Sequence, residues 1–152
     1  MKYLLILSSL LLGACSKSEE EPTLLVNGVN HAETHEEVNV APELGTLEIG
    51  WDNIKSDVNF YLVTEEKQLS IKEEEVGVIK LGSVLKSEVN KFVCNVNSSY
   101  TEVTCSTPGS DIENIVEMTE LVSNIPQKLI LYIEYVADDG SMNLTGAIVY
   151  LN

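Results

Sequence analysis

Apolar and polar residues alternate with a period of two along most of the chain from about residue 45 onward. This spacing predicts β-strands with one buried face, because successive side chains of a strand point to opposite sides. The apolar faces of the three clearest strands consist of Leu47, Ile49 and Trp51; Val58, Phe60 and Leu62; and Leu129, Leu131, Ile133 and Tyr135. The chain is therefore expected to be built mainly from half-buried strands.

Further strands are predicted around these three. An apolar run interrupted by two glycines, EVGVIKLGSVL, covers residues 75–85, and one face of the last strand consists of Ala147, Val149 and Leu151. Residues 138–141, Asp-Asp-Gly-Ser, have the composition of a turn between the final two strands. TLLVNGV at residues 23–29 and EEVNVAP at residues 36–42 are the candidates for an opening edge strand, whose end the proline marks.

The segment KFVCNVNSSYTEVTCST predicts a β-hairpin centred on residues 99–100. Folding the chain there places Val96 opposite Val103 and Cys94 opposite Cys105. The register that pairs the valines also pairs the thiols, so we expect a disulfide, which stabilises a loop of this length by roughly 3 kcal/mol. A zinc site is the alternative, but two thiols without a nearby histidine supply too few ligands.

One segment, SDIENIVEMTELVSNIP at residues 110–126, has a different pattern. Ser110 precedes Glu113 by three residues, as in a capping box. The apolar residues that fall roughly on one helical face are Ile112, Ile115, Val116 and Val122. We expect a short helix here; a strand is the alternative, because Val116 and Met118 also alternate.

About eight short strands, with turn residues every ten or so positions, are typical of an all-β sandwich. The stretch from Leu47 to Val63, with a tryptophan on one strand and aromatic residues on the next, resembles the B and C strands of fibronectin type III domains. YIEYVADDGS, residues 132–141, resembles their F strand and the turn into strand G. The resemblance spans most of residues 40–152 and implies an immunoglobulin- or fibronectin III-like antiparallel sandwich. The cysteine hairpin and the expected helix depart from that pattern.

The start of the chain has the pattern of an export signal. Residues 1–2 are a positive start, residues 3–12 are uncharged and mostly aliphatic, and two small residues follow. This run is shorter than the roughly 20 apolar residues that a transmembrane helix needs. The motif LGAC at residues 12–15 resembles the lipobox of bacterial lipoproteins.

The lipobox resemblance implies that the Cys15 thiol receives a diacylglyceryl group, that the chain is cut just before it, and that the new amine is acylated, for example with palmitate. Several acyl chains, at about 0.8 kcal/mol per buried methylene, make a stable anchor. In this family the absence of aspartate after the cysteine implies sorting to the outer membrane, and Ser16 occupies that position. SKSEEE at residues 16–21 also resembles the acidic export tag of cell-surface lipoproteins; a hydrated, self-repelling tether is the alternative.

The expected organisation is a signal peptide at residues 1–14, a lipidated cysteine and acidic tether at 15–40, and a β-sandwich domain at 41–152. A domain of about 110 residues is large enough for one hydrophobic core. Once Cys15 is acylated, Cys94 and Cys105 remain as an even pair in an oxidising compartment, which agrees with the expected disulfide.

The charge of the chain limits the classes of molecule that it is expected to bind. It has 9 basic and 24 acidic residues, a formal net charge of −15, and every basic residue is a lysine. This argues against binding to nucleic acid and against direct adsorption to anionic lipid, since both require positive charge. The lack of arginine removes the bidentate guanidinium that phosphate and carboxylate sites prefer. A basic partner or divalent cations remain compatible with the sequence, and a soluble anionic surface is the simplest interpretation.

Candidate catalytic and metal-binding groups are few. In HAETHEE, His31 and His35 share one face of a strand or stack one turn apart in a helix, so they are candidate metal ligands. The stretch lacks the His-Glu-x-x-His motif and a third distant ligand, and we interpret it as solvated and polar. We interpret the glutamates at residues 65–66 and 73–75 as exposed loop charge, and DDGSMN at residues 138–143 as a turn, since it lacks the spacing of an EF-hand.

No Gly-x-Ser-x-Gly motif is present, and no enzyme activity or cofactor is expected. We therefore expect a lipid-anchored envelope lipoprotein that acts as a non-catalytic binding module. It would contact the membrane through its N-terminal lipid and bind a protein or glycan of the envelope. The alternatives are an accessory structural subunit of a secretion, pilus or motor complex, by analogy alone, and a metal-handling lipoprotein that depends on His31 and His35.

Overall fold

A computed structural model of the chain describes residues 21–31, 37–40, 45–68, 70–86 and 90–152. In this part of the chain the regular secondary structure consists of strands alone. They are β1 (Thr23–Val26), β2 (Val29–Asn30), β3 (Val38–Val40), β4 (Thr46–Asp52), β5 (Val58–Val63), β6 (Val78–Val84), β7 (Lys91–Val96), β8 (Glu102–Ser106), β9 (Glu113–Glu117), β10 (Gln127–Val136) and β11 (Met142–Leu151). None of the described residues belongs to a helix that is long and apolar enough to span a membrane.

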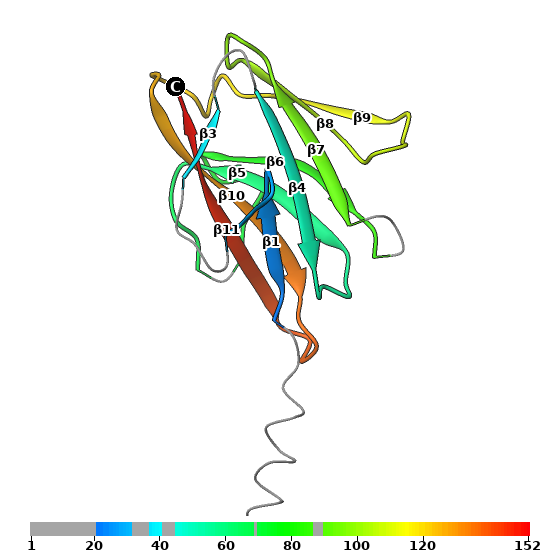
Figure 1. Cartoon of the computed structure of the whole chain (residues 1–152). Helices are drawn as coiled ribbons and strands as arrows, with labels where there is room; N and C mark the ends of the chain where they lie inside the picture. Colours follow the sequence, from blue (N-terminus) through cyan, green and yellow to red (C-terminus); the bar gives the residue numbers. More distant parts are fainter. Residues whose placement is uncertain (1–20, 32–36, 41–44, 69, 87–89) are drawn as a thin grey trace, which may run out of the picture.

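The strands form two sheets that pack face to face (Figure 1). One sheet has the order β2-β1-β4-β7-β8-β9, and the other has the order β3-β11-β10-β5-β6. Neighbouring strands are antiparallel except for β3, which runs parallel to β11. The all-β sandwich predicted from the alternating pattern is confirmed, with eleven strands among the described residues instead of about eight.

The strand order explains both the likeness to immunoglobulin-type sandwiches and the departure from them. The order β11-β10-β5-β6 is that of strands G, F, C and C′, and β1 and β4 are neighbours as strands A and B are. On the other side of β4, the consecutive strands β7, β8 and β9 form an antiparallel meander that adds three strands to this sheet. The departure expected at the cysteine hairpin is therefore present.

The segments that were candidates for an opening edge strand supply three strands. TLLVNGV forms β1 and β2, which are joined by a turn at Asn27 and Gly28 with positive φ angles of 51° and 83°. An Asn-Gly pair favours this tight hairpin because both residues tolerate positive φ. β1 lies between β2 and β4, so it is an interior strand, whereas β2 and β3 are edges of their sheets in the described residues.

The main core lies between the two sheets and is centred on three aromatic rings. Trp51 of β4, Phe60 of β5 and Phe92 of β7 are at most 5% exposed. The ring centroids of Trp51 and Phe60 are 5.2 Å apart, and those of Phe60 and Phe92 are 4.4 Å apart in a stacked arrangement. Contacts of this kind contribute about 0.5–1.5 kcal/mol beyond the burial of apolar area. The apolar faces predicted for β4 and β5 thus form the contact between the sheets.

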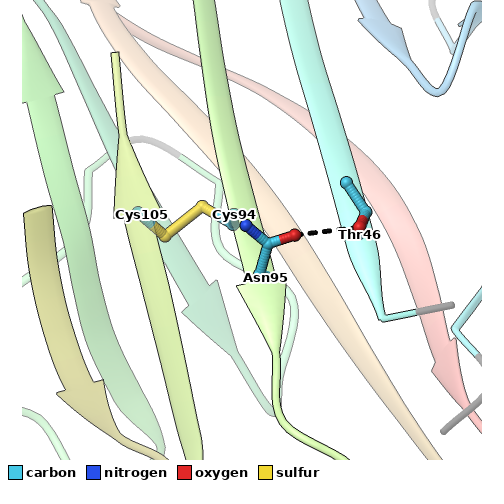
Figure 2. The surroundings of a disulfide bond; sticks show 4 residues. All are labelled: Thr46, Cys94, Asn95 and Cys105. Carbon is cyan, nitrogen blue, oxygen red and sulfur yellow. Dashed lines mark hydrogen bonds between the residues drawn. A yellow bond between two sulfur atoms is a disulfide. The ribbon is translucent and has the colours of Figure 1, made fainter. Parts of the chain in front are cut away.

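A disulfide between Cys94 and Cys105 joins β7 to β8 (Figure 2). The two cysteines lie directly opposite each other in the predicted register, and their Cα atoms are 4.1 Å apart. Both side chains are fully buried in the main core. On the outer face of β7, Asn95 Oδ1 accepts a hydrogen bond of 2.8 Å from Thr46 Oγ1, which links β7 to β4.

The helix expected at residues 110–126 is not formed, and this prediction is wrong. The central part of the segment is β9, which pairs with β8 in an antiparallel register. Ser110 does not cap a helix; its Oγ accepts a hydrogen bond of 3.2 Å from the backbone N–H of Ile112. The apolar residues also fit a period of two, and hydrogen bonding to β8 satisfies the backbone of the strand.

Candidate functional site

Polar and charged side chains gather on the outer face of the five-stranded sheet, beneath the chain that joins β5 to β6. We call residues 64–68 and 70–77 the covering segment. With the flanking strands, it encloses an apolar cluster that is separate from the main core and consists of Tyr61, Val63, Ile71, Val78, Ile130 and Tyr132. The segment therefore buries a sheet face that would otherwise contact water.

The hydroxyl of Tyr132, in the middle of β10, fixes the start of the covering segment. This oxygen accepts a hydrogen bond of 3.1 Å from the backbone N–H of Lys67 and donates one of 3.3 Å to the carbonyl oxygen of the same residue. A single side chain thus satisfies both backbone groups of a residue that lies outside any strand. Buried backbone groups require such partners.

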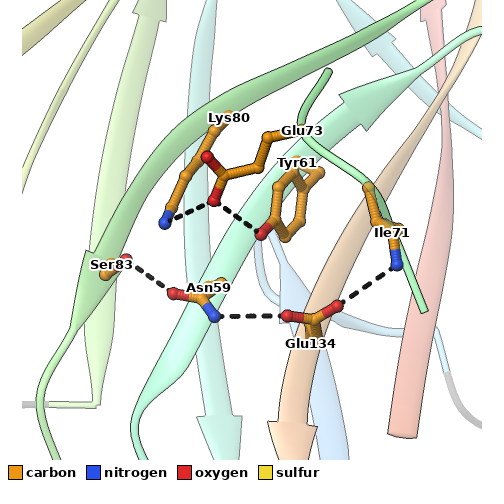
Figure 3. A network of polar contacts seen from close by, with 7 residues as sticks. All are labelled: Asn59, Tyr61, Ile71, Glu73, Lys80, Ser83 and Glu134. Carbon is orange, nitrogen blue, oxygen red and sulfur yellow. Dashed lines mark hydrogen bonds and ion pairs between the residues drawn. The ribbon is translucent and has the colours of Figure 1, made fainter. Parts of the chain in front are cut away.

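Glu134 of β10 is a carboxylate that is only 5% exposed (Figure 3). Its two oxygens accept hydrogen bonds of 3.3 Å, one from Asn59 Nδ2 and one from the backbone N–H of Ile71. Asn59 Oδ1 in turn accepts a hydrogen bond of 2.6 Å from Ser83 Oγ. This chain of contacts joins β10, β5, β6 and the covering segment, and it gives the buried carboxylate the polar partners that burial demands.

A second set of contacts closes the middle of the covering segment over Tyr61. Glu73 Oε1 accepts hydrogen bonds from Lys80 Nζ at 3.0 Å and from the Tyr61 hydroxyl at 3.4 Å. Burial, followed by the nearby charges of Glu134 and Glu73, raises the pKa of Tyr61 to about 12. The hydrogen bond from Lys80 and its positive charge lower the pKa of Glu73 below its ordinary value.

Glu75 closes the covering segment on itself. Its Oε2 lies 2.7 Å from Lys67 Nζ, and this pairing lowers the pKa of Glu75. The interpretation of residues 65–66 and 73–75 as exposed loop charge is confirmed, since all five are exposed. Two of them nevertheless have defined lysine partners. The chemistry that this face supports is therefore attachment of the covering segment, since Glu73, Glu75 and Glu134 bind a lysine, an amide or a backbone N–H.

The two histidine candidates are not brought together by the described residues, because His35 lies outside them. His31 is 7% exposed, and its backbone N–H donates to the carbonyl oxygen of Leu24 at 2.9 Å. Its Nε2 has no hydrogen-bond partner within the described part of the chain. No group of three or more histidine, cysteine, aspartate or glutamate side chains suited to a metal ion occurs among the described residues.

The interpretation of residues 138–143 as a turn between strands is confirmed for residues 138–141, whereas residues 142 and 143 already belong to β11. Asp139 Oδ1 accepts hydrogen bonds from the backbone N–H of Ser141 at 2.9 Å and from its Oγ at 2.5 Å. These bonds lower the pKa of Asp139. The neighbouring Asp138 lies 3.8 Å from Lys55 Nζ, on the turn between β4 and β5. The oxygens that could have bound calcium thus stabilise the turn instead.

A groove of about 360 Å³ lies between β6 and β9, which are the last strands of their sheets on this side of the described sandwich. Its walls include Lys80 and Gly82 from β6 and Asn114 and Ile115 from β9. A Cβ atom on Gly82 would lie 2.7 Å from Asn114 Nδ2, so the glycine permits this close approach of the two sheets. Sequence reasoning missed the groove because it placed a helix where β9 lies.

Comparison with known proteins finds no matching family model, no matching curated protein and no matching solved structure.

Proposed function

We propose that the chain is a lipid-anchored, non-catalytic binding module of the bacterial outer membrane. The observation that carries the proposal is the LGAC motif at residues 12–15, which ends an export-type segment and precedes an acidic stretch. A lipid on Cys15 would hold the sandwich at the membrane through that stretch. The partner would be a protein or a glycan of the cell envelope.

The end at which the chain enters the sandwich supports this arrangement. Asn53 Nδ2 donates a hydrogen bond of 3.0 Å to the carbonyl oxygen of Glu21, so the first described residues lie beside the β4–β5 turn. The β10–β11 turn lies at the same end (Figure 1). Asn152 lies at the other end, where its carbonyl oxygen accepts a hydrogen bond from the Tyr100 hydroxyl. An anchor before residue 21 would therefore leave both sheets and the far end open to a partner.

The use of the charged side chains supports a binding role rather than a catalytic one. Glu73, Glu134 and Lys80, which the fold brings together, hold the covering segment on the sheet. Carboxylates in general acid–base chemistry must instead be positioned to reach a substrate proton. The remaining surface includes open strand edges and turns, which suits recognition of another molecule.

Metabolic labelling with a palmitate analogue tests the anchor. The full-length protein is expected to incorporate the label and to sediment with outer membranes. Cys15→Ser is expected to lose both properties, whereas Cys94→Ser with Cys105→Ser keeps the label and serves as the matched control for loss of a thiol. An unlabelled wild-type protein, or equal labelling of Cys15→Ser, would refute the proposal.

The binding role has its own test. The full-length protein is immobilised and incubated with a detergent extract of the envelope, and excess free protein is used for elution. A protein or glycan that is retained and then released by this competition supports the proposal. If neither class of molecule is retained, the binding role is contradicted even where acylation is confirmed.

A further inference from the structure

The strand β9 has an open backbone edge. Among the described strands, it pairs only with β8. The backbone N–H of Met118 donates to the carbonyl oxygen of Thr101 at 2.8 Å, which makes these two residues a hydrogen-bonded pair at the end of the β8–β9 ladder. Such pairs alternate with non-hydrogen-bonded pairs in an antiparallel ladder. The N–H and C=O groups of Glu113, Ile115 and Glu117 therefore point away from β8, toward the open edge.

The side chains of the same three residues form a row on the outer face of the sheet. They lie opposite the partly or fully exposed side of β8, whereas Asn114 and Val116 lie opposite its buried cysteine and valine. Ile115 is 63% exposed, so its apolar side chain can be reached from solvent. The row thus has an apolar centre with a carboxylate two residues away on each side. We call Glu113, Ile115 and Glu117, with their free backbone groups, the β9 edge.

We propose that the β9 edge accepts an extended peptide segment of an envelope protein, with a lysine or arginine two residues before and two residues after an apolar residue. The inference rests on the proposed binding role and names the chemistry of the partner. Added as a strand, the peptide pairs its backbone with the free groups of Ile115 and its apolar side chain with the Ile115 side chain. Its two cations then lie opposite Glu113 and Glu117.

Cross-strand pairs of opposite charge stabilise a sheet, and like charges directly opposite each other destabilise it. A basic peptide benefits at both glutamates. It also benefits from Glu102 of β8, which lies opposite Glu117, so that two carboxylates are adjacent on this face. The intervening peptide residues face the groove beside Gly82 of β6, where small or β-branched side chains fit.

The same charges argue against the other occupants. If two copies of the chain paired antiparallel through β9, centred on Ile115, Glu113 of each copy would lie opposite Glu117 of the other. Both copies also carry a formal net charge of −15. The acidic SKSEEE stretch at residues 16–21 would meet the same repulsion. Charged edge residues are a known device against unwanted strand pairing, and here they select for a basic strand.

Fluorescence anisotropy with a labelled synthetic peptide tests the inference. The probe is acetyl-Ser-Lys-Val-Ile-Val-Lys-Ser-amide, and its comparison peptide has glutamate in place of both lysines. The full-length protein in neutral detergent is expected to bind the lysine peptide and not the glutamate peptide. The dissociation constant is expected to rise with salt, because paired exposed charges are screened.

Two variants separate the backbone and charge contributions. Ile115→Pro removes an N–H that faces the open edge and leaves the ladder to β8 intact, a position where proline is tolerated; we expect binding to weaken by about tenfold or more. Ile115→Ala, which removes the side chain and keeps the N–H, is its control and is expected to weaken binding less. Glu113→Lys with Glu117→Lys is expected to reverse the preference in favour of the glutamate peptide. Glu65→Lys with Glu66→Lys makes the same change of charge on the exposed covering segment and is expected to leave the preference unchanged.

Hydrogen exchange gives a readout that does not depend on the folding of any variant. In the free protein the amides of Glu113, Ile115 and Glu117 are expected to exchange rapidly, and the lysine peptide is expected to protect them. The amide of Val116, which faces β8, is expected to be slow with or without peptide. Absence of protection, or a preference that both charge-reversal variants retain, would overturn the inference. An acylated protein that binds neither peptide refutes the inference and leaves the anchor standing.

Discussion

Replacing Gly82 with alanine should destabilise the sandwich at the point where β6 meets β9. The new Cβ would lie 2.7 Å from Asn114 Nδ2 and 2.9 Å from Phe92 Cζ. The amide can rotate away, but the Phe92 ring is 1% exposed and stacked on Phe60, so the ring or the β6 backbone must shift. Overpacking of this kind costs about 1–3 kcal/mol. The φ of +153° at Gly82 adds a backbone cost of about 1–2 kcal/mol for alanine.

Gly140→Ala is the matched control for this substitution. Gly140 also has a positive φ, +84°, but nothing lies within 4 Å of the position that its Cβ would occupy. Alanine there should carry only the backbone cost of about 1–2 kcal/mol. The free energy of unfolding should therefore fall by at least about 1 kcal/mol more for Gly82→Ala than for Gly140→Ala.

Urea unfolding followed by the fluorescence of Trp51, the single tryptophan, measures both free energies of unfolding with the disulfide intact. Phe92→Leu should reduce the extra loss in a double-mutant cycle, because a shorter side chain leaves room for the new methyl group. Equal losses for the two glycine variants, or strict additivity of Gly82→Ala with Phe92→Leu, would refute the steric reasoning.

Three further predictions concern the disulfide and the covering segment. Cys94→Ala with Cys105→Ala should lower the free energy of unfolding by about 3 kcal/mol, since the cysteines are 11 residues apart; an unchanged melting temperature would contradict this. The free energy of unfolding should be insensitive to Tyr61 below pH 10 and should fall between its ordinary pKa of 10.0 and its folded pKa of about 12. The unfolded state releases the proton first, so stability is lost over this pH window, by at most about 3 kcal/mol because solvent screens part of the interaction. Tyr61→Phe should remove this part of the slope in urea titrations at stepped pH. Tyr132→Phe should cost about 1 kcal/mol and speed hydrogen exchange at the Lys67 amide, which donates to the Tyr132 hydroxyl; exchange as slow as in the wild type would show that other contacts hold the segment.

The side chains that face the main core were predictable because their pattern is local. The faces of β4 and β5 and the register of the cysteine hairpin follow from alternation alone, and so does the disulfide. The turn at residues 138–141 follows from its residue types. In each case the residues that determine the structure are close together in the sequence.

The helix prediction failed because its pattern was compatible with two periods. The residues from Ile112 to Met118 fit one helical face nearly as well as they fit a strand, and the hydrogen-bonding edge of β8 decided between them. Sequence alone did not show that edge, because its position depends on how the hairpin sits in the sheet. The β9 edge and the groove beside it were missed for the same reason.

The sequence of β10 indicates that its outer face is covered, and this could have predicted the covering segment. Outward-facing positions of β10 carry Ile130 and Tyr132, so this strand is apolar on both faces. Such a strand needs cover on both sides. Glu134 follows on the same outer face, and its burial was not foreseeable, since its partners Asn59 and Ile71 come from elements distant in the sequence.

The order of strands has a mechanical consequence. A pull on β9 against an anchor that precedes β1 is transmitted sideways through one sheet, across the contacts β1–β4, β4–β7, β7–β8 and β8–β9 in turn. The first two and the last are held by non-covalent contacts, which at β4–β7 include the ion pair of Glu48 and Lys91, while the disulfide of Cys94 and Cys105 makes the third covalent. Under tension β7 and β8 should therefore stay together while a neighbouring pair of strands separates. Reduction of the disulfide would allow β7 and β8 to separate as well, and so would change the place at which the sheet comes apart.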